Sequence, residues 1–148
     1  MEVKLSDIGE GFSGQERLNA EKLISSILQP VAREFSFKIT SGLRRQATNK
    51  VVGGVLGSDH LYGAAADLVP IGHSVEIIFR WMFEQKFPYR QLICSRYKEV
   101  NRETGKWTGS WGKWIHVSVN HPAKKFKNET WIESDGKMME FKGEIWRV

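Results

Sequence analysis

Hydrophobic positions between residues 13 and 35 recur at steps of three and four residues, a spacing typical of an amphipathic helix. The stripe consists of Leu18, Ile24, Ile27, Leu28, Val31, Ala32 and Phe35. Ser13 and Glu16 precede it with the spacing of a capping box, which marks the start of a helix. Pro30 lies inside the pattern, so we expect a kink there, or two shorter helices that meet.

Shorter apolar or alternating stretches predict strands. They are Phe37–Thr40, Ala64–Pro70, Gln91–Cys94, Trp131–Glu133 and Met138–Phe141. The last two flank Asp135-Gly136, a dipeptide typical of a tight hairpin turn. A second helix is expected after Ser74, which is a suitable N-cap for the apolar positions that follow.

Two segments are predicted to be loops. The stretch 49–57 is rich in glycine and has room for one helical turn, and 96–112 is polar and contains Trp107 and Trp111. Tryptophans in such a loop either stack on a bound ligand or pack back onto the core, and the sequence does not decide between the two.

These elements predict a single α+β domain with an antiparallel sheet and helices on one face. A chain of 148 residues, 41% hydrophobic and 26% charged, has the size and composition of one globular domain. Residues 120–148 form a β-rich C-terminal extension. It could cover a sheet edge, bind a bacterial envelope or mediate assembly.

The charge and the hydropathy of the chain limit the kinds of partner that it is expected to bind. The net charge of +5 favours an anionic partner, but the basic residues are scattered without interleaved aromatics, so we do not expect nucleic-acid binding. No apolar run of eighteen residues and no signal-peptide pattern occurs. We therefore expect synthesis in the cytoplasm and no stable membrane insertion.

Cys94, the only cysteine, is expected to be a buried small hydrophobic residue.

His60 and Asp67 stand seven positions apart, and His116 lies in a separate apolar stretch. Imidazole nitrogen and carboxylate oxygen are ligands that Zn²⁺ takes in tetrahedral sites, and three protein ligands leave a fourth position open for water. We predict that these three residues form a catalytic zinc site. His73 and His121 are expected to be surface or capping histidines instead.

The segment from Ser41 to Asp67 reads SGLRRQATNKVVGGVLGSDHLYGAAAD. It resembles the Ser-Gly-Tyr-Arg, Asn-Lys-x-Val-Gly-Gly and Ser-x-His-x-x-Gly-x-Ala-x-Asp motifs of the zinc-dependent D-alanyl-D-alanine carboxypeptidase family, which includes phage endolysins. A closing Trp-x-His-x-Ser motif is present at 114–118. The resemblance spans about residues 18–119 and implies a fold like that of the hedgehog and D-Ala-D-Ala peptidase proteins.

The resemblance also implies roles for two further residues. Arg44 stands at the arginine of the Ser-Gly-Tyr-Arg motif, where it would hold a substrate carboxylate or the developing oxyanion. Leu43 replaces the tyrosine of that motif. Ser58 would orient a metal ligand or a substrate carboxylate, or act only as a turn residue.

The general base departs from the family pattern. An acidic residue is expected after Gln91–Cys94, but Ser95 stands there, and Lys113 lies three residues before His116. Neither accepts a proton readily at neutral pH. We name Glu99, in the predicted loop, as the candidate base; otherwise it is a solvated loop charge.

The expected function is hydrolysis of a peptide bond in peptidoglycan stem peptides by a zinc metallopeptidase that acts at the bacterial cell wall and is encoded by a phage. The bond lies either between L-alanine and D-glutamate or at a D-alanine terminus. The alternative is a catalytically inactive relative with a structural or binding role, such as a component of a phage particle. The host and the oligomeric state stay open.

Overall fold

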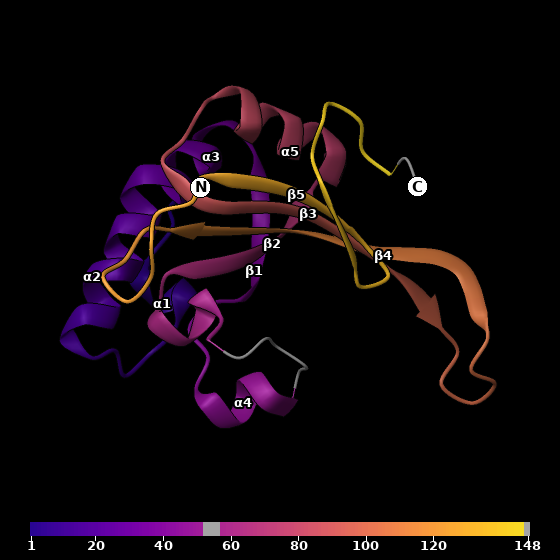
Figure 1. Cartoon of the computed structure of the whole chain (residues 1–148), viewed down its shortest axis with the longest axis horizontal. Coiled ribbons are helices and arrows are strands. Elements are labelled where there is room, and N and C mark those ends of the chain that lie inside the picture. The colour runs from indigo at the N-terminus through magenta and orange to yellow at the C-terminus, as the bar shows by residue number, and fades with distance from the viewer. Residues whose placement is uncertain (52–56, 147–148) are drawn as a thin grey trace.

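A computed structural model describes residues 1–51 and 57–146. Its strands are β1 Ser36–Ser41, β2 Ala65–Ile71, β3 Tyr89–Val100, β4 Trp107–Val119, β5 Glu129–Ser134 and β6 Lys137–Glu140. Its helices are α1 Leu5–Ile8, α2 Gly14–Leu23, the π-helical turn η1 Ile24–Leu28, α3 Gln29–Glu34, α4 Gln46–Val51, the 3-10 turn η2 Asp59–Tyr62 and α5 Val75–Glu84. Figure 1 shows their arrangement.

The strands form one sheet of mixed direction in the order β1-β2-β4-β3-β5-β6. The prediction of a purely antiparallel sheet is therefore wrong, because β5 runs parallel to β3. The reason lies in the connection after β4. Val119, at the end of β4, pairs with Tyr89 at the start of β3, and β5 begins beside Gln91, so the returning chain takes the direction of β3.

The two faces of the sheet have different neighbours because side chains alternate along each strand. Leu68, Leu92, Ile115 and Val117 belong to one buried cluster that includes residues of α2, η1, α3 and α5. Helix α2 contacts β4, and helix α5 contacts β2, β3 and β4. The opposite face of the central strands is left to polar side chains, which form the site described below.

The N-terminal helical segment has the predicted start, and a π-helical turn joins its two α-helical parts without a gap. The Ser13 side chain accepts a hydrogen bond from the Glu16 amide, and Glu16 reaches back to the Ser13 amide, which completes the capping box. Between α2 and α3 the helix widens into η1, just before Pro30. Proline offers no amide to the preceding turn, so an interruption of the regular pattern at this point is expected.

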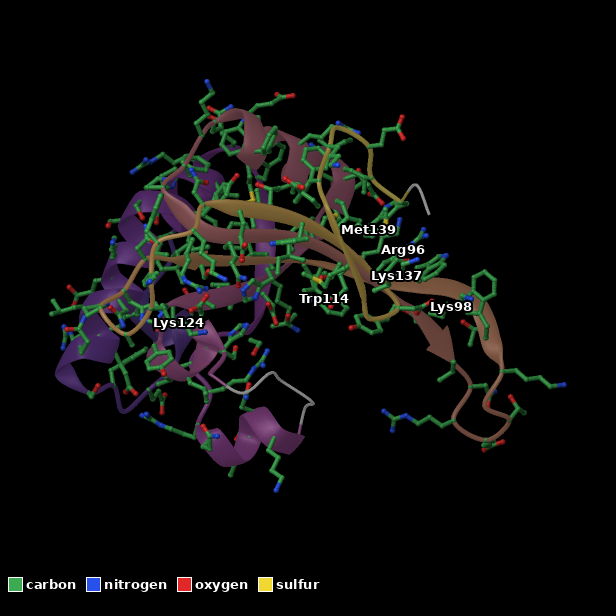
Figure 2. The ribbon with its side chains drawn as sticks, viewed as in Figure 1. Arg96, Lys98, Trp114, Lys124, Lys137 and Met139 are labelled. Atoms are coloured by element: carbon green, nitrogen blue, oxygen red, sulfur yellow. The ribbon has the colours of Figure 1, made fainter. Side chains whose placement is uncertain are left out.

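The predicted loop 96–112 is instead the outer part of a two-stranded ribbon, in which β3 and β4 continue beyond the sheet (Figure 1). Cross-strand ring contacts stabilise it. Tyr97 stacks on Trp114 with ring centroids 5.3 Å apart, and the Arg96 guanidinium lies 4.0 Å from the Trp111 ring centroid. Figure 2 shows Arg96, Lys98 and Trp114 along this ribbon.

The C-terminal hairpin forms as predicted. β5 and β6 pair antiparallel around Asp135 and Gly136, both of which have positive φ values of 49° and 83°. Such a turn matches the twist of a hairpin. β5 covers the outer edge of β3, as expected if the C-terminal extension protects a sheet edge, whereas envelope binding and assembly stay predictions.

Several smaller features also bear on the predictions. β2 runs through Pro70 to Ile71, and the Ser74 side chain caps α5. Cys94 is buried, and its burial raises the pKa of the thiol. The predicted helical turn in 49–57 overlaps the end of α4, whereas residues 52–56 lie outside the described part of the chain. Within the described ranges, the helices are too short or too polar to cross a bilayer.

Candidate metal centre

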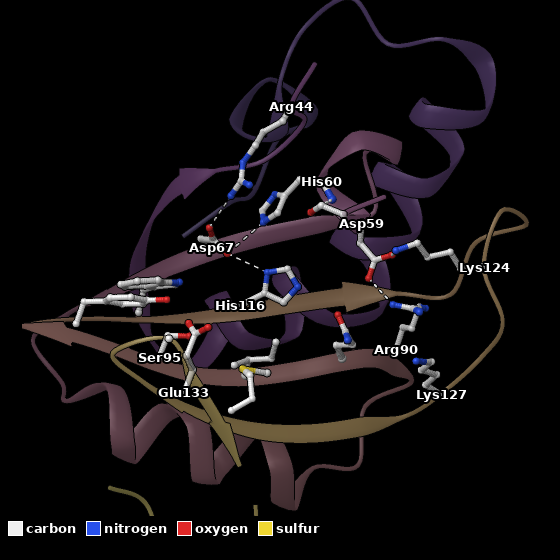
Figure 3. Close-up of a pocket in the computed structure, with 17 residues that line it drawn as sticks. Arg44, Asp59, His60, Asp67, Arg90, Ser95, His116, Lys124, Lys127 and Glu133 are labelled. Carbon is white, nitrogen blue, oxygen red and sulfur yellow. Dashed lines mark hydrogen bonds and ion pairs between the residues drawn. The ribbon is translucent and has the colours of Figure 1, made fainter. Parts of the chain in front are cut away.

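Two neighbouring strands and one turn bring the three predicted metal ligands together. Asp67 on β2 and His116 on β4 are directly paired in the sheet, and η2 supplies His60. Asp67 Oδ1 lies 3.0 Å from His116 Nδ1 and 3.2 Å from His60 Nε2 (Figure 3). One donor atom of each residue lies within 4.8 Å of the other two.

The hydrogen bonding of His60 leaves one ring nitrogen free to bind a cation. Its Nδ1–H donates to the Gly42 carbonyl oxygen over 2.7 Å. Burial lowers the pKa of His60, which favours the neutral ring. With the proton on Nδ1, Nε2 faces the Asp67 carboxylate as a second acceptor, an arrangement that suits a cation between the two groups.

The donor set fits zinc. At Zn–N and Zn–O distances of about 2.0–2.2 Å, tetrahedral geometry places two ligand atoms roughly 3.3–3.6 Å apart. The observed 3.0 and 3.2 Å around Asp67 Oδ1 are slightly shorter than this. The carbonyl that accepts from His60 is the kind of outer partner that fixes the orientation of a ligating histidine.

Asp67 is a carboxylate in this environment. Burial alone would raise its pKa, but the close contacts with His116 and His60 outweigh that effect and hold the pKa of Asp67 below its ordinary value. A buried carboxylate that stays charged is suited to a divalent cation, because the ion compensates the charge.

Arg44 supports the carboxylate from the other side. Its guanidinium donates to Ser41 Oγ over 2.9 Å, Asn49 Oδ1 over 3.1 Å and Asp67 Oδ2 over 3.3 Å. Guanidinium has five N–H donors, so two are not used by these contacts. Arg44 therefore orients Asp67 and also has donors to offer to the cleft, which it lines.

The turn η2 is held by its own caps. Ser58 Oγ accepts a hydrogen bond from the His60 amide over 3.2 Å. Gly63 ends the turn with φ 69°, and a Cβ there would lie 2.8 Å from the Glu16 carbonyl oxygen. Both the positive φ and this close approach require glycine. Ser58 thus acts as a turn residue that positions the backbone of His60, and it also lines the cleft.

Substitution of Gly42 tests the hydrogen bond that its carbonyl oxygen accepts from His60. A Cβ at Gly42 would lie 2.1 Å from the Ile8 carbonyl oxygen, so the backbone must shift and carry the carbonyl that holds His60 with it. We expect Gly42→Ala to lower the free energy of unfolding by about 1–3 kcal/mol and zinc affinity by about 10–100-fold. Chemical denaturation and zinc titration would measure both. Gly14→Ala is the control because nothing lies within 4 Å of its Cβ.

A buried ionic cluster lies beside the metal centre. Asp59 Oδ2 accepts a hydrogen bond from Arg90 over 2.7 Å, and Asp59 Oδ1 lies 2.9 Å from His121 Nε2 and 3.7 Å from Lys124 Nζ. His121 is 6% exposed, so its predicted surface position is wrong. The cluster ties η2 to β3 and to the segment after β4, which the sequence pattern of these residues does not reveal.

These groups line one cleft of about 880 Å³, a size usual for ligand sites. In Figure 3, Arg90, Lys124 and Lys127 lie at one end, Ser95 and Glu133 lie toward the other, and the metal centre lies between them. Within the described residues, Glu133 lines this cleft and Glu99 does not. Glu99 lies on the exposed ribbon part of β3, so the structure does not bring it to the metal centre.

Glu133 was missed because no local signal identifies it. Its position over the cleft follows from the pairing of β5 with β3. This pairing cannot be predicted without knowing how the chain returns to the sheet after β4. The observation that could have suggested it is the missing acid at Ser95.

Comparison with protein families gives one match. The model of the family described as Peptidase M15 matches residues 1–118, which include α1 to β4 and all three predicted ligands. A comparison with curated proteins found no match.

Proposed function

The chain belongs to the peptidase M15 family, and from this premise we propose that it is a zinc metallopeptidase that cuts a peptide bond in peptidoglycan stem peptides. Members of this family are hydrolases, in general zinc-dependent, that act on peptidoglycan-like substrates. The observation that carries the proposal for this chain is the convergence of three side chains: His60 from η2, Asp67 from β2 and His116 from β4.

In the proposed mechanism, His60 Nε2, His116 Nδ1 and the Asp67 carboxylate hold the ion. When bound, zinc activates water and polarises the scissile carbonyl. The Gly42 carbonyl keeps the proton on His60 Nδ1, so that Nε2 stays a ligand. Arg44 holds Asp67 in place and donates its remaining N–H groups to a substrate carboxylate or to the developing oxyanion.

The charges along the cleft favour an anionic peptide. Lys124 and Lys127 lie at the end of the cleft that also contains Arg90 (Figure 3). Stem peptides carry free carboxylates, so this end would attract them and set the position of the peptide over the metal. Both candidate bonds, the one between L-alanine and D-glutamate and the one at a D-alanine terminus, lie close to such a carboxylate.

The test uses purified protein loaded with one equivalent of zinc and purified bacterial cell walls. We expect loss of turbidity and new amino termini, both abolished by a chelator and restored by zinc. Mass spectrometry of the soluble products would separate an endopeptidase, which exposes a D-glutamate amine, from a carboxypeptidase, which releases D-alanine.

A folded protein that binds zinc at about one ion per chain but releases nothing from walls or from free stem peptides would contradict the proposal. That result would instead favour the inactive relative with a structural role, for example in a phage particle. Phage origin and action at the cell wall belong to the proposal and would be supported by lysis of cells when the protein is applied from outside.

A further inference from the structure

We propose that Glu133 is the general base of this peptidase, supplied by β5 in place of the acidic residue that Ser95 replaces. The inference rests on the proposed function and names the residue that completes it. Its basis is the position of Glu133 in the cleft, which no sequence motif indicates.

The sheet register places Glu133 beside the position where the acid is missing. Ser95 on β3 and Glu133 on β5 are direct partners in the parallel pairing. Paired residues project to the same face, so the Glu133 carboxylate rises from the face that carries His116. Figure 3 shows it beside Ser95, within the cleft.

Glu133 and His116 lie on the two strands that flank β3, and both line the same cleft. Ser95 is paired with Trp114, two residues from His116 on β4, and Glu133 is paired with Ser95 one strand spacing of about 4.8 Å beyond it, so that two such spacings separate β5 from β4. The side chain of Ser95, the residue between Glu133 and β4, is small. The glutamate side chain can extend over it, and a base can reach its proton directly or through one water.

Two stacked aromatic residues line the cleft beside Glu133. Tyr97 stacks on Trp114 with nearly parallel rings, 8° between their planes. Burial, followed by the charge of Glu133 and its hydrogen bonding, raises the pKa of Tyr97. Tyr97 and Glu133 line the same cleft, and a neighbouring ring of this kind limits the conformations of a half-buried glutamate.

The proton moves in two steps. Glu133 accepts a proton from the attacking water while the water oxygen bonds to the carbonyl carbon. The carbon–nitrogen bond then breaks, and Glu133 delivers that proton to the leaving nitrogen. The products are a carboxylic acid, which keeps the second proton of the water, and an amine, so the reaction needs no other reactant.

The test compares Glu133→Gln with wild type. We expect kcat to fall by about 10²–10⁴-fold with little change in KM, while zinc content stays at about one ion per chain. A second readout needs no metal and no substrate. In the zinc-free protein, ultraviolet titration should show a lower pKa for Tyr97 in Glu133→Gln, because the carboxylate that raises it is gone.

A rescue variant distinguishes loss of the base from a general defect. Ser95→Glu in the Glu133→Gln background restores a carboxylate on the neighbouring strand. We expect the kcat of this double variant to be at least about tenfold higher than that of Glu133→Gln. Glu140→Gln, on the exposed strand of the same hairpin, is the matched control and should keep wild-type kcat.

The outcomes separate this inference from the proposed function. An active wild type whose Glu133→Gln variant keeps its kcat would overturn the role of Glu133 alone, and a selective loss in Glu99→Gln would assign the base to Glu99. A wild type that binds zinc and cuts nothing would overturn both.

Discussion

Replacement of His116 with alanine is expected to remove zinc from the protein and to abolish hydrolysis. His116 Nδ1 lies 3.0 Å from Asp67 Oδ1, so the loss of the ring leaves two of the three protein ligands. Loss of an outer partner of a ligand costs about 10–100-fold in metal affinity, and loss of a direct ligand should exceed that. Metal analysis should fall from about one zinc per chain to near zero, with zinc affinity measured by competition with a chelator.

His73→Ala is the matched control for this prediction. His73 is exposed just before α5, where its ring contacts Phe35 at a centroid distance of 5.1 Å. We expect unchanged zinc content and activity. If His116→Ala binds zinc as tightly as wild type while its circular dichroism stays native, the assignment of His116 as a ligand is wrong.

Asp59→Ala is expected to have the largest effect on stability. The Asp59 and Arg90 side chains are 1% and 6% exposed, and truncation leaves the Arg90 guanidinium buried without its carboxylate. Breaking a buried ion pair in this way costs about 3–5 kcal/mol. For a chain of this size we expect the melting temperature to fall by roughly 6–20 °C. Thermal unfolding should be followed in the presence of a chelator, so that zinc does not contribute.

The exposed pair of Arg17 and Glu21, at 65% and 50% exposure, supplies the control. Glu21→Ala removes a carboxylate of similar geometry on the surface of α2, and we expect a change of less than about 1 kcal/mol. Equal effects of Asp59→Ala and Glu21→Ala would contradict the importance that we assign to the buried cluster.

The same cluster makes stability depend on pH. Burial alone would raise the pKa of Asp59, but hydrogen bonds from His121 and Ser118 and the charges of Arg90 and Lys124 lower it well below its ordinary value. A carboxyl group with a lowered folded-state pKa stabilises the protein above its unfolded pKa of about 3.9 and loses this contribution as the pH falls further. Zinc-free wild type should therefore lose stability below about pH 4–5 more steeply than Asp59→Ala.

Features that depend on neighbouring residues were predicted correctly. They are the capping box at Ser13 and the hairpin at Asp135. Each involves residues only a few positions apart, whose backbone preferences act within one turn. The mixed direction of the sheet was not predicted, because it depends on which edge of β3 the returning chain joins.

The ribbon formed by β3 and β4 illustrates a second limit. Its sequence is polar and contains glycine, which favoured a loop, yet Tyr97 and Trp114 stack across the two strands. Cross-strand pairs of this kind exist only once the register is set. With the ribbon formed, Glu99 lies on a strand outside the cleft, and the candidate base that the loop interpretation favoured is not placed at the metal centre.

The types of the donor residues were enough to name His60, Asp67 and His116 as candidate metal ligands, because zinc selects ligand types. The surroundings of this candidate site depend on the assembled fold, which places the Gly42 carbonyl behind His60 and Glu133 beside Ser95. Those neighbours arise from contacts between segments 18 and 38 residues apart. Local preferences do not encode such contacts, since they depend on how the whole sheet assembles.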